Sequence, residues 1–163
     1  MPLATAPLNA PALEWPKAAP AILWSGLIAG AMDITAAFVN WGFRGIRPAR
    51  ILQGIASGLL GPSAFQGGAA TAALGGLLHF FIAFSAATVF FLASRKWSVL
   101  MQRAVLAGTI YGIAVYTVMY WVVVPLSAVR RGPFSWEATV IAIVTHIFCV
   151  GLPISLAVKR FSR

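Results

Sequence analysis

Long apolar runs alternate with short polar connections along this chain of 163 residues. Uncharged stretches cover residues 51–94, 104–129 and 138–158, and the only charged residue between Lys17 and Arg44 is Asp33. A helix needs roughly 20 apolar residues to cross the hydrocarbon core of a bilayer. The pattern therefore predicts four membrane-spanning helices, over about 21–43, 71–93, 103–126 and 138–158.

These spans are expected to be helices rather than barrel strands. Backbone polar groups must be satisfied internally in lipid, and spanning strands are only about ten residues long. Tryptophans, which favour the membrane interface, fall near the predicted ends of the spans, at Trp24, Trp41, Trp97, Trp121 and Trp136. The predicted fold class is all-α, a four-helix transmembrane bundle.

The longest connection, residues 44–70, contains a short segment with its own periodicity. Pro48 can start a helix and Gly61-Pro62 can end it. Ile51, Leu52, Ile55 and Leu59 share one face, whereas Arg50, Gln53 and Ser57 face elsewhere. We predict a short amphipathic helix over 49–60 that lies in the interface, with the basic residues Arg44, Arg47 and Arg50 beside the headgroups. A re-entrant segment is the alternative.

The two ends of the chain lie outside the predicted membrane domain, 21–159. Residues 1–20 contain five prolines and are predicted to form a flexible extended tail. They lack the basic start and short apolar core of a signal peptide, so the first span is expected to remain as an anchor. Residues 160–163 form a short basic tail.

Composition agrees with a membrane protein. Hydrophobic residues make up 60% of the chain and charged residues only 9%, whereas a soluble domain has about a quarter. The net charge of +9 comes from lysines and arginines clustered at the ends of apolar runs, where lipid headgroups would meet them. A bilayer partner is expected and a nucleic-acid partner is not.

The positions of lysine and arginine predict an orientation. With the N-terminus inside, the cytoplasmic side holds Lys17, Arg95, Lys96, Arg103, Lys159, Arg160 and Arg163, which is seven basic residues. The opposite side holds Arg44, Arg47, Arg50, Arg130 and Arg131, which is five. Because cytoplasmic loops carry the excess of basic residues, both termini are predicted to be cytoplasmic.

Three ionisable side chains fall inside the spans: Asp33, His79 and His146. At a rise of about 1.5 Å per residue, all three lie on the same side of the midplane, within roughly 5 Å of one another in depth. Tyr116 on the third span lies at a similar level. An aspartate at a helix centre costs about 2.5–3.5 kcal/mol on the insertion scale. The four residues are therefore a candidate proton or solute site.

Other interpretations of these residues remain open. The cluster can be a polar clasp that holds the helices together. Two histidines at similar depth also suggest an alternative hypothesis, in which both histidines ligate a haem. No tight ligand-spacing motif supports a metal site, so no cofactor is predicted beyond this haem alternative.

Glycine and proline mark further features of the spans. Gly26-x3-Gly30 and Gly108-x3-Gly112 allow close helix contact, which is expected within the bundle rather than in a dimer. Pro153 removes a backbone donor and predicts a kink or gate near His146. Ser135 and Glu137 resemble an N-cap and a first-turn acid at the start of the fourth span.

The chain contains no paired carboxylates, nucleophile elbow, cysteine pair or phosphate-binding loop, and is not predicted to be an enzyme. "GLIAG…VNWG" in the first span, the mid-span His79, "LAG" opening the third span, "VPLS" at its end and the His146-bearing fourth span resemble the YagU-like group of small bacterial inner-membrane proteins. The resemblance implies a four-helix inner-membrane protein. It gives no mechanism.

Three functions are compatible with these features. The first is a small transporter or proton-linked membrane protein that uses the Asp/His cluster, alone or as a homodimer. The second is a non-catalytic scaffold or assembly subunit for a membrane-complex partner. The third is a haem-bearing electron carrier.

Overall fold

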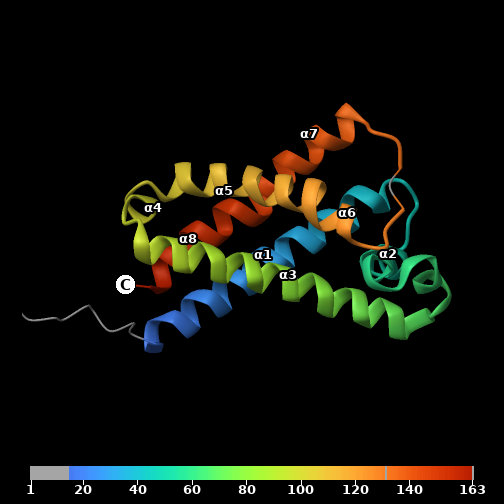
Figure 1. Cartoon of the computed structure of the whole chain (residues 1–163), viewed down its shortest axis with the longest axis horizontal. Helices are drawn as coiled ribbons and strands as arrows, with labels where there is room; N and C mark the ends of the chain where they lie inside the picture. Colours follow the sequence, from blue (N-terminus) through green and yellow to red (C-terminus); the bar gives the residue numbers. More distant parts are fainter. Residues whose placement is uncertain (1–14, 131, 163) are drawn as a thin grey trace, which may run out of the picture.

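A computed structural model describes residues 15–130 and 132–162, and the described chain is almost entirely helical (Figure 1). Four helical segments are long and apolar enough to cross a membrane: Ala18–Gly42, Gly68–Lys96, Ala104–Leu126 and Trp136–Phe161. The predicted all-α, four-helix architecture is confirmed.

Two of these segments are single helices and two are interrupted by a wider turn. The first and second are α1 (Trp15–Gly42) and α3 (Gly68–Lys96). The third is α5 (Ala104–Val118), the π-helical turn η2 (Met119–Val123) and α6 (Val124–Leu126). The fourth is α7 (Trp136–Thr145), the π-helical turn η3 (His146–Gly151) and α8 (Leu152–Phe161). The connections contain α2 (Pro48–Leu60), the 3-10 turn η1 (Gly61–Gln66) and α4 (Val99–Gln102).

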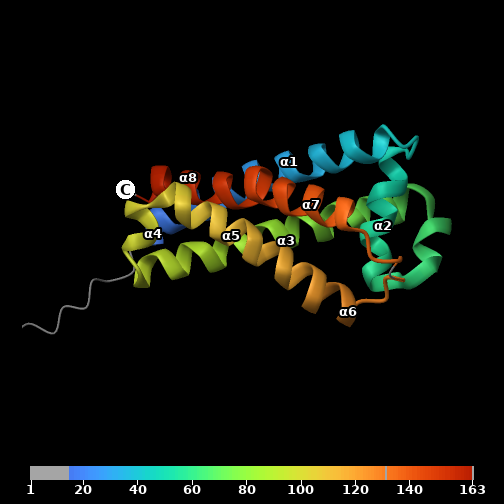
Figure 2. The ribbon, with the colours of Figure 1, turned by 90° about the horizontal axis from the view of Figure 1, so that it is seen from above.

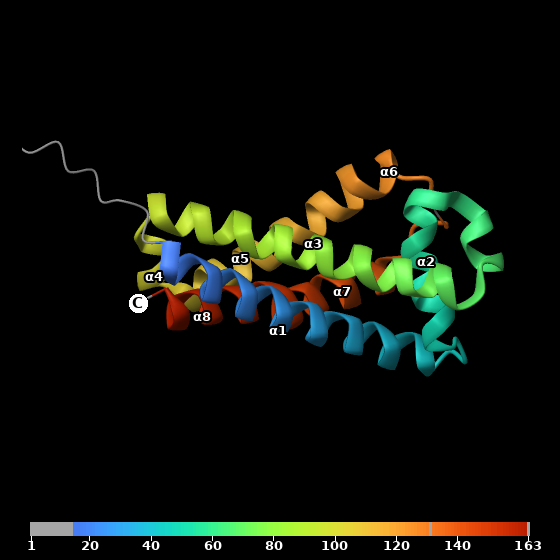
Figure 3. The same cartoon turned by 90° about the horizontal axis from the view of Figure 1, so that it is seen from below.

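The bundle differs between its two ends. Helix α1 packs against α3 and α8, and α5 packs against η3 and α8. At the end formed by α4 and α8, which we call the closed end, the helices stay together (Figures 1 and 3). At the other end, which we call the open end, α6 and α7 diverge and α2 lies crosswise to the long helices (Figure 2).

The hydrophobic core lies toward the closed end. Phe90 of α3 and Ile154 of α8 are almost completely buried. The buried cluster around them is Ala18, Ala21, Ala29, Ala87, Phe91, Ala107, Val150 and Val158. Tyr111 packs edge-on against Phe90 at 5.0 Å between ring centroids, and its hydroxyl donates a hydrogen bond of 2.7 Å to the Ala86 carbonyl. Small and aromatic residues thus fill this half of the bundle.

The two predicted glycine motifs pack within the bundle, as expected. Gly26 and Gly30 of α1 lie against Phe84 and Phe80 of α3. On the other side of the bundle, the backbones of Gly108 and Gly112 approach that of η3 so closely that a Cβ would have no space. Both motifs therefore set the distance between neighbouring helices of one chain.

Each π-helical turn lies directly before a proline: η2 precedes Pro125, and η3 precedes Pro153. Proline has no N–H to donate, and its ring clashes with the carbonyl four residues before it. A wider turn relieves that clash. The turn near Pro153, where a kink or gate was predicted, begins at His146.

Helix α2 agrees closely with the predicted helix over 49–60, and its crosswise position agrees with an interfacial helix (Figure 2). The structure adds which of its faces meets the bundle. Gln53 and Ser57 are buried, whereas Leu59 is 64% exposed. Gln53 turns toward the protein because its Nε2 donates a hydrogen bond of 3.0 Å to the Gly68 carbonyl. The polar side thus packs on the bundle, and part of the apolar stripe faces outward.

Several boundaries differ from the sequence-based expectation. Helix α1 begins at Trp15, so residues 15–20 are helical rather than an extended tail; residues 1–14 lie outside the described residues. Pro16 lies in the first turn, where backbone N–H groups have no partner within the helix. Pro20 has no N–H, so the helix loses one backbone hydrogen bond near its N-terminal end. Helix α8 continues to Phe161. The predicted N-cap is confirmed, since Ser135 Oγ accepts a hydrogen bond of 3.3 Å from the Ala138 N–H.

Candidate functional site

All four residues of the predicted cluster line one cavity of about 350 Å³. Asp33 comes from α1, His79 from α3, Tyr116 from α5, and His146 from the first position of η3. The structure thus brings together the residues that the sequence placed at a similar depth. Each of the four spans contributes at least one polar side chain to the same space.

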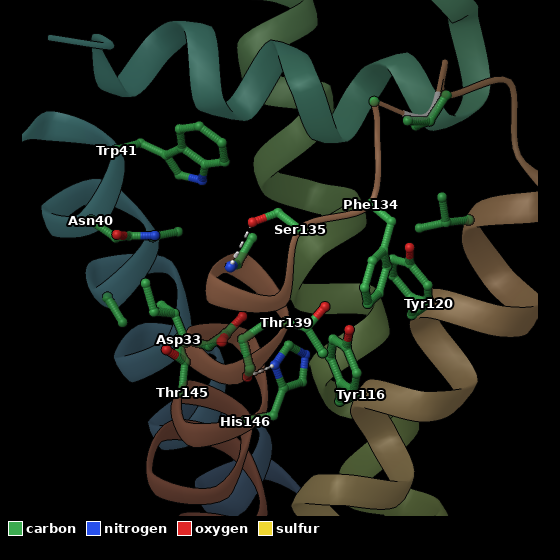
Figure 4. A pocket seen from close by; sticks show the side chains of 18 of the residues that line it. Asp33, Asn40, Trp41, Tyr116, Tyr120, Phe134, Ser135, Thr139, Thr145 and His146 are labelled. Carbon is green, nitrogen blue, oxygen red and sulfur yellow. Dashed lines mark hydrogen bonds between the residues drawn. The ribbon is translucent and has the colours of Figure 1, made fainter. Parts of the chain in front are cut away.

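A second cavity of about 530 Å³ extends from this site toward the open end. Asp33, Tyr116, Tyr120 and His146 line both cavities. The outer cavity alone reaches Asn40, Trp41, Arg44, Phe134, Arg130 and Thr139 (Figure 4). We call the first space, which is mostly apolar with a few polar side chains, the inner cavity and the second space the outer cavity.

His79 connects two helices at the inner cavity. Its Nε2 lies 2.8 Å from the Gly30 carbonyl of α1, so this nitrogen carries the proton and donates it. Gly30 lies one helical turn before Asp33 on α1. The histidine therefore acts as a clasp between α3 and α1, but it binds the backbone rather than the carboxylate.

His146 is oriented by its own helix. Its Nδ1 lies 2.8 Å from the Ala142 carbonyl one turn earlier. The ring packs edge-on against Tyr116, with 5.7 Å between centroids and 72° between planes. Tyr116 is stacked with Tyr120 at 5.7 Å. Tyrosines and imidazole form a continuous aromatic wall along one side of the cavities (Figure 4).

Asp33 is half-buried in the cavity wall. Within residues 15–130 and 132–162, its carboxylate makes no hydrogen bond or ion pair with another residue. The hydrogen bonds of both histidines go to backbone carbonyls rather than to this carboxylate. The structure brings the three groups into one chamber without joining them.

Three further polar residues of the cavities escaped the sequence analysis, although their spacing gave a signal. Tyr120 follows Tyr116 by four residues, Asn40 follows Asp33 by seven, and Thr139 precedes His146 by seven. Such spacings place side chains on one helix face. A search for further polar residues on the helix face of each candidate residue would have identified all three.

The remaining predicted residues lie around the site. Arg44 and Arg50 are exposed near the open end, and their guanidinium groups lie over Trp41 at 5.1 Å and Phe65 at 4.0 Å. Arg50 also donates a hydrogen bond of 3.3 Å to the Phe65 carbonyl. Arg47 is exposed just before α2. Pro153 lies in α8, two residues beyond the end of η3.

Binding of a metal ion or a haem would depend on the histidines and acidic residues of the site. The described residues contain no group of three or more His, Cys, Asp or Glu side chains placed to hold a metal ion. His79 Nε2 and His146 Nδ1 are each engaged by a backbone carbonyl. A haem would therefore have to be ligated through the other ring nitrogen of each histidine.

No family model, curated protein or solved structure matches the chain. The fold and site alone define its class: an all-α protein whose four apolar helices are compatible with a multi-pass membrane protein. All four apolar segments contribute polar side chains to its inner cavity.

Proposed function

We propose that this protein is a small proton-linked membrane transporter in which Asp33, His79, Tyr116 and His146 form the proton and solute site. The observation that supports this most directly is the convergence of these side chains, one from each span, on a single cavity. Ionisable residues inside membrane spans are costly and are usually associated with proton or substrate pathways.

The arrangement of packed and open halves also favours transport. The core seals the closed end, whereas the cavities extend toward the open end. The π-helical turns η2 and η3 contribute residues to the inner cavity. Such turns are common at functional sites, and helices bend at them. They are suitable hinges for opening the closed end while the open end closes.

Reconstitution tests this function. The full chain is incorporated into liposomes that contain a pH-sensitive dye, and a proton gradient or candidate solute gradient is imposed. We expect a protein-dependent change of internal pH that protein-free liposomes lack. A scaffold moves no protons, and a haem carrier would show a Soret band that shifts on reduction. A colourless, proton-silent preparation would contradict the transporter proposal and favour the scaffold.

We place the protein in the bacterial inner membrane, with both termini and the closed end in the cytoplasm. This proposal rests on the resemblance to the YagU-like group and on the positions of the basic residues. Arg95, Lys96, Arg103, Lys159 and Arg160 all lie at the closed end, near α4 or at the end of α8 (Figure 1). Basic residues favour the cytoplasmic side.

Cysteine labelling tests this orientation. In a chain carrying Cys149→Ala, we expect Ser63→Cys to react with an impermeant thiol reagent in intact cells and Ser98→Cys to react only after lysis. Both serines are exposed and lie at opposite ends of the bundle. Ser127 also lies at the open end, but it is half-buried beside α2 and is therefore a poorer probe. The reverse labelling pattern would overturn the orientation.

A further inference from the structure

The inner cavity has an unusual balance of charge. Among the described residues that line it, Asp33 is the only Asp, Glu, Lys or Arg. The other polar groups around it are the two imidazoles and the hydroxyls of Tyr116 and Tyr120. The remaining lining residues are apolar, among them Ile34, Ile82 and Val115. A single negative charge thus lies in an apolar chamber, where attraction to an opposite charge is stronger than in water.

The aromatic wall is a second feature of the cavity that attracts positive charge. Tyr116 and Tyr120 are nearly parallel, with 19° between their planes, and both line the inner cavity. The face of an aromatic ring attracts a cation within about 6 Å of its centroid. The carboxylate and these electron-rich rings of the cavity lining therefore both favour positive charge.

The size and chemistry of the chamber indicate what kind of cation fits. Its volume of about 350 Å³ is within the range of pockets for small organic ligands, about 300–1,000 Å³. Hard inorganic cations such as Ca²⁺ require six or more oxygen ligands, and this cavity offers one carboxylate and two phenols. A cation that carries its own apolar groups matches the apolar walls better.

We propose that the inner cavity binds a small organic cation, an amine or quaternary ammonium with apolar substituents, and that Asp33 is its counter-ion. This inference rests on the proposed function, because it names the class of solute that the transporter would carry. The ammonium lies against Asp33 and the faces of Tyr116 and Tyr120. The apolar substituents occupy the space beside Ile34 and Ile82.

Two arginines described near the open end, Arg44 and Arg130, are not among the residues that line this chamber. Arg44 and Arg130 line only the outer cavity, and the Arg44 guanidinium lies over the Trp41 ring. An organic anion would instead be drawn to these arginines. The two ligand classes are therefore separated by position as well as by charge.

Calorimetric titration of the full chain in an uncharged mild detergent tests the proposal. The probe is benzyltrimethylammonium, and phenylmethanesulfonate is the anion of similar size. We expect the cation to bind with a stoichiometry of one per chain and the anion to bind at least tenfold more weakly. Equal affinities, or tighter binding of the anion, would overturn the proposal.

A pair of charge variants locates the binding site. Asp33→Asn is expected to weaken cation binding by about tenfold or more, which corresponds to about 1.4 kcal/mol. Glu137→Gln removes the same charge from an exposed position outside both cavities and is expected to bind like the unmodified chain. Equal losses in both variants would indicate a general charge effect and overturn the assignment to Asp33.

The aromatic wall is tested separately. Tyr116→Leu is expected to lose about three- to tenfold in affinity, because the cation loses one ring face. Tyr116→Phe keeps the ring and should recover most of that loss. Because Tyr116 is buried, Tyr120→Leu at a half-buried position tests the same wall if Tyr116→Leu does not fold. Unchanged affinity in a folded leucine variant would exclude a role for the wall.

These measurements separate the solute from the transport mechanism. Proton movement in liposomes without cation binding would overturn the assignment of an organic cation and leave a proton-linked protein. Asp33-dependent cation binding without proton movement would support the site and contradict proton linkage.

Discussion

Asp33→Asn is expected to abolish protein-dependent proton uptake in liposomes while leaving insertion and thermal stability unchanged. Asparagine keeps the shape and hydrogen-bonding capacity of the side chain but cannot bind and release a proton. Within the described residues, Asp33 makes no hydrogen bond or ion pair, so the substitution removes no contact between helices. The two measurements are dye-reported proton uptake and thermal unfolding in detergent.

Asp33→Leu distinguishes a functional carboxylate from a structural one. If Asp33 held the histidines in place, leucine would leave buried partners unsatisfied and would lower stability by about 1–3 kcal/mol. In this structure His79 and His146 bind backbone carbonyls instead. We therefore expect Asp33→Leu to be as stable as the unmodified chain or more so, since it removes the cost of a carboxylate inside a span.

The matched control for both variants is Glu137→Gln. Glu137 lies in the first turn of α7 and is exposed, so its loss changes the net charge without touching the cavities. Unchanged proton uptake in Asp33→Asn would contradict the hypothesis that the cluster forms a proton site. A fall in stability in Asp33→Leu alone would restore the interpretation as a clasp.

The spans and the site were predictable for simple geometric reasons. The length of an uncharged run determines how many times a chain can cross a bilayer, and the observed segments agree with the expected ones within a few residues. The depth of Asp33, His79 and His146 follows from the rise of a helix alone. A common depth was enough to place these residues around one cavity once four helices pack together.

What the sequence did not predict depends on how each helix is rotated. The long helices are apolar on all sides, so their periodicity does not distinguish the face that meets lipid from the face that meets protein. For α2, the sequence did not indicate which face meets the bundle, because Gln53 finds a backbone acceptor at Gly68 that lies 15 residues away along the chain. The partner of His79, the carbonyl of Gly30, is likewise a backbone atom on another helix.

The same chain thus places small residues where helices must touch and polar residues where they separate. Glycines bring α5 against η3 below the site. Tyr116, Tyr120 and His146 occupy the adjoining stretch, where α5 and α7 begin to diverge (Figure 4). The helices are in close contact on one side of His146 and separate on the other. Packed backbone therefore closes the cavity on the first side.

Gly151→Ala is therefore expected to lower thermal stability markedly. A Cβ at Gly151 would meet the Gly108 carbonyl and the backbone N and Cα of Gly112. These are backbone atoms of a packed helix and cannot rotate aside as a flexible side chain can. Overpacking of this kind costs typically about 1–3 kcal/mol, and here it would force α5 and η3 apart.

Gly76→Ala is the matched control, because nothing lies within 4 Å of the Cβ position at Gly76. Alanine in a helix interior is favoured over glycine by about 0.8–1.0 kcal/mol, so Gly76→Ala should be neutral or stabilising. The measurement is thermal unfolding of both variants in the same detergent. Equal melting temperatures would contradict the close approach of α5 and η3. Because η3 begins at His146, a separated interface should also displace this imidazole and weaken cation binding in whatever fraction of Gly151→Ala remains folded.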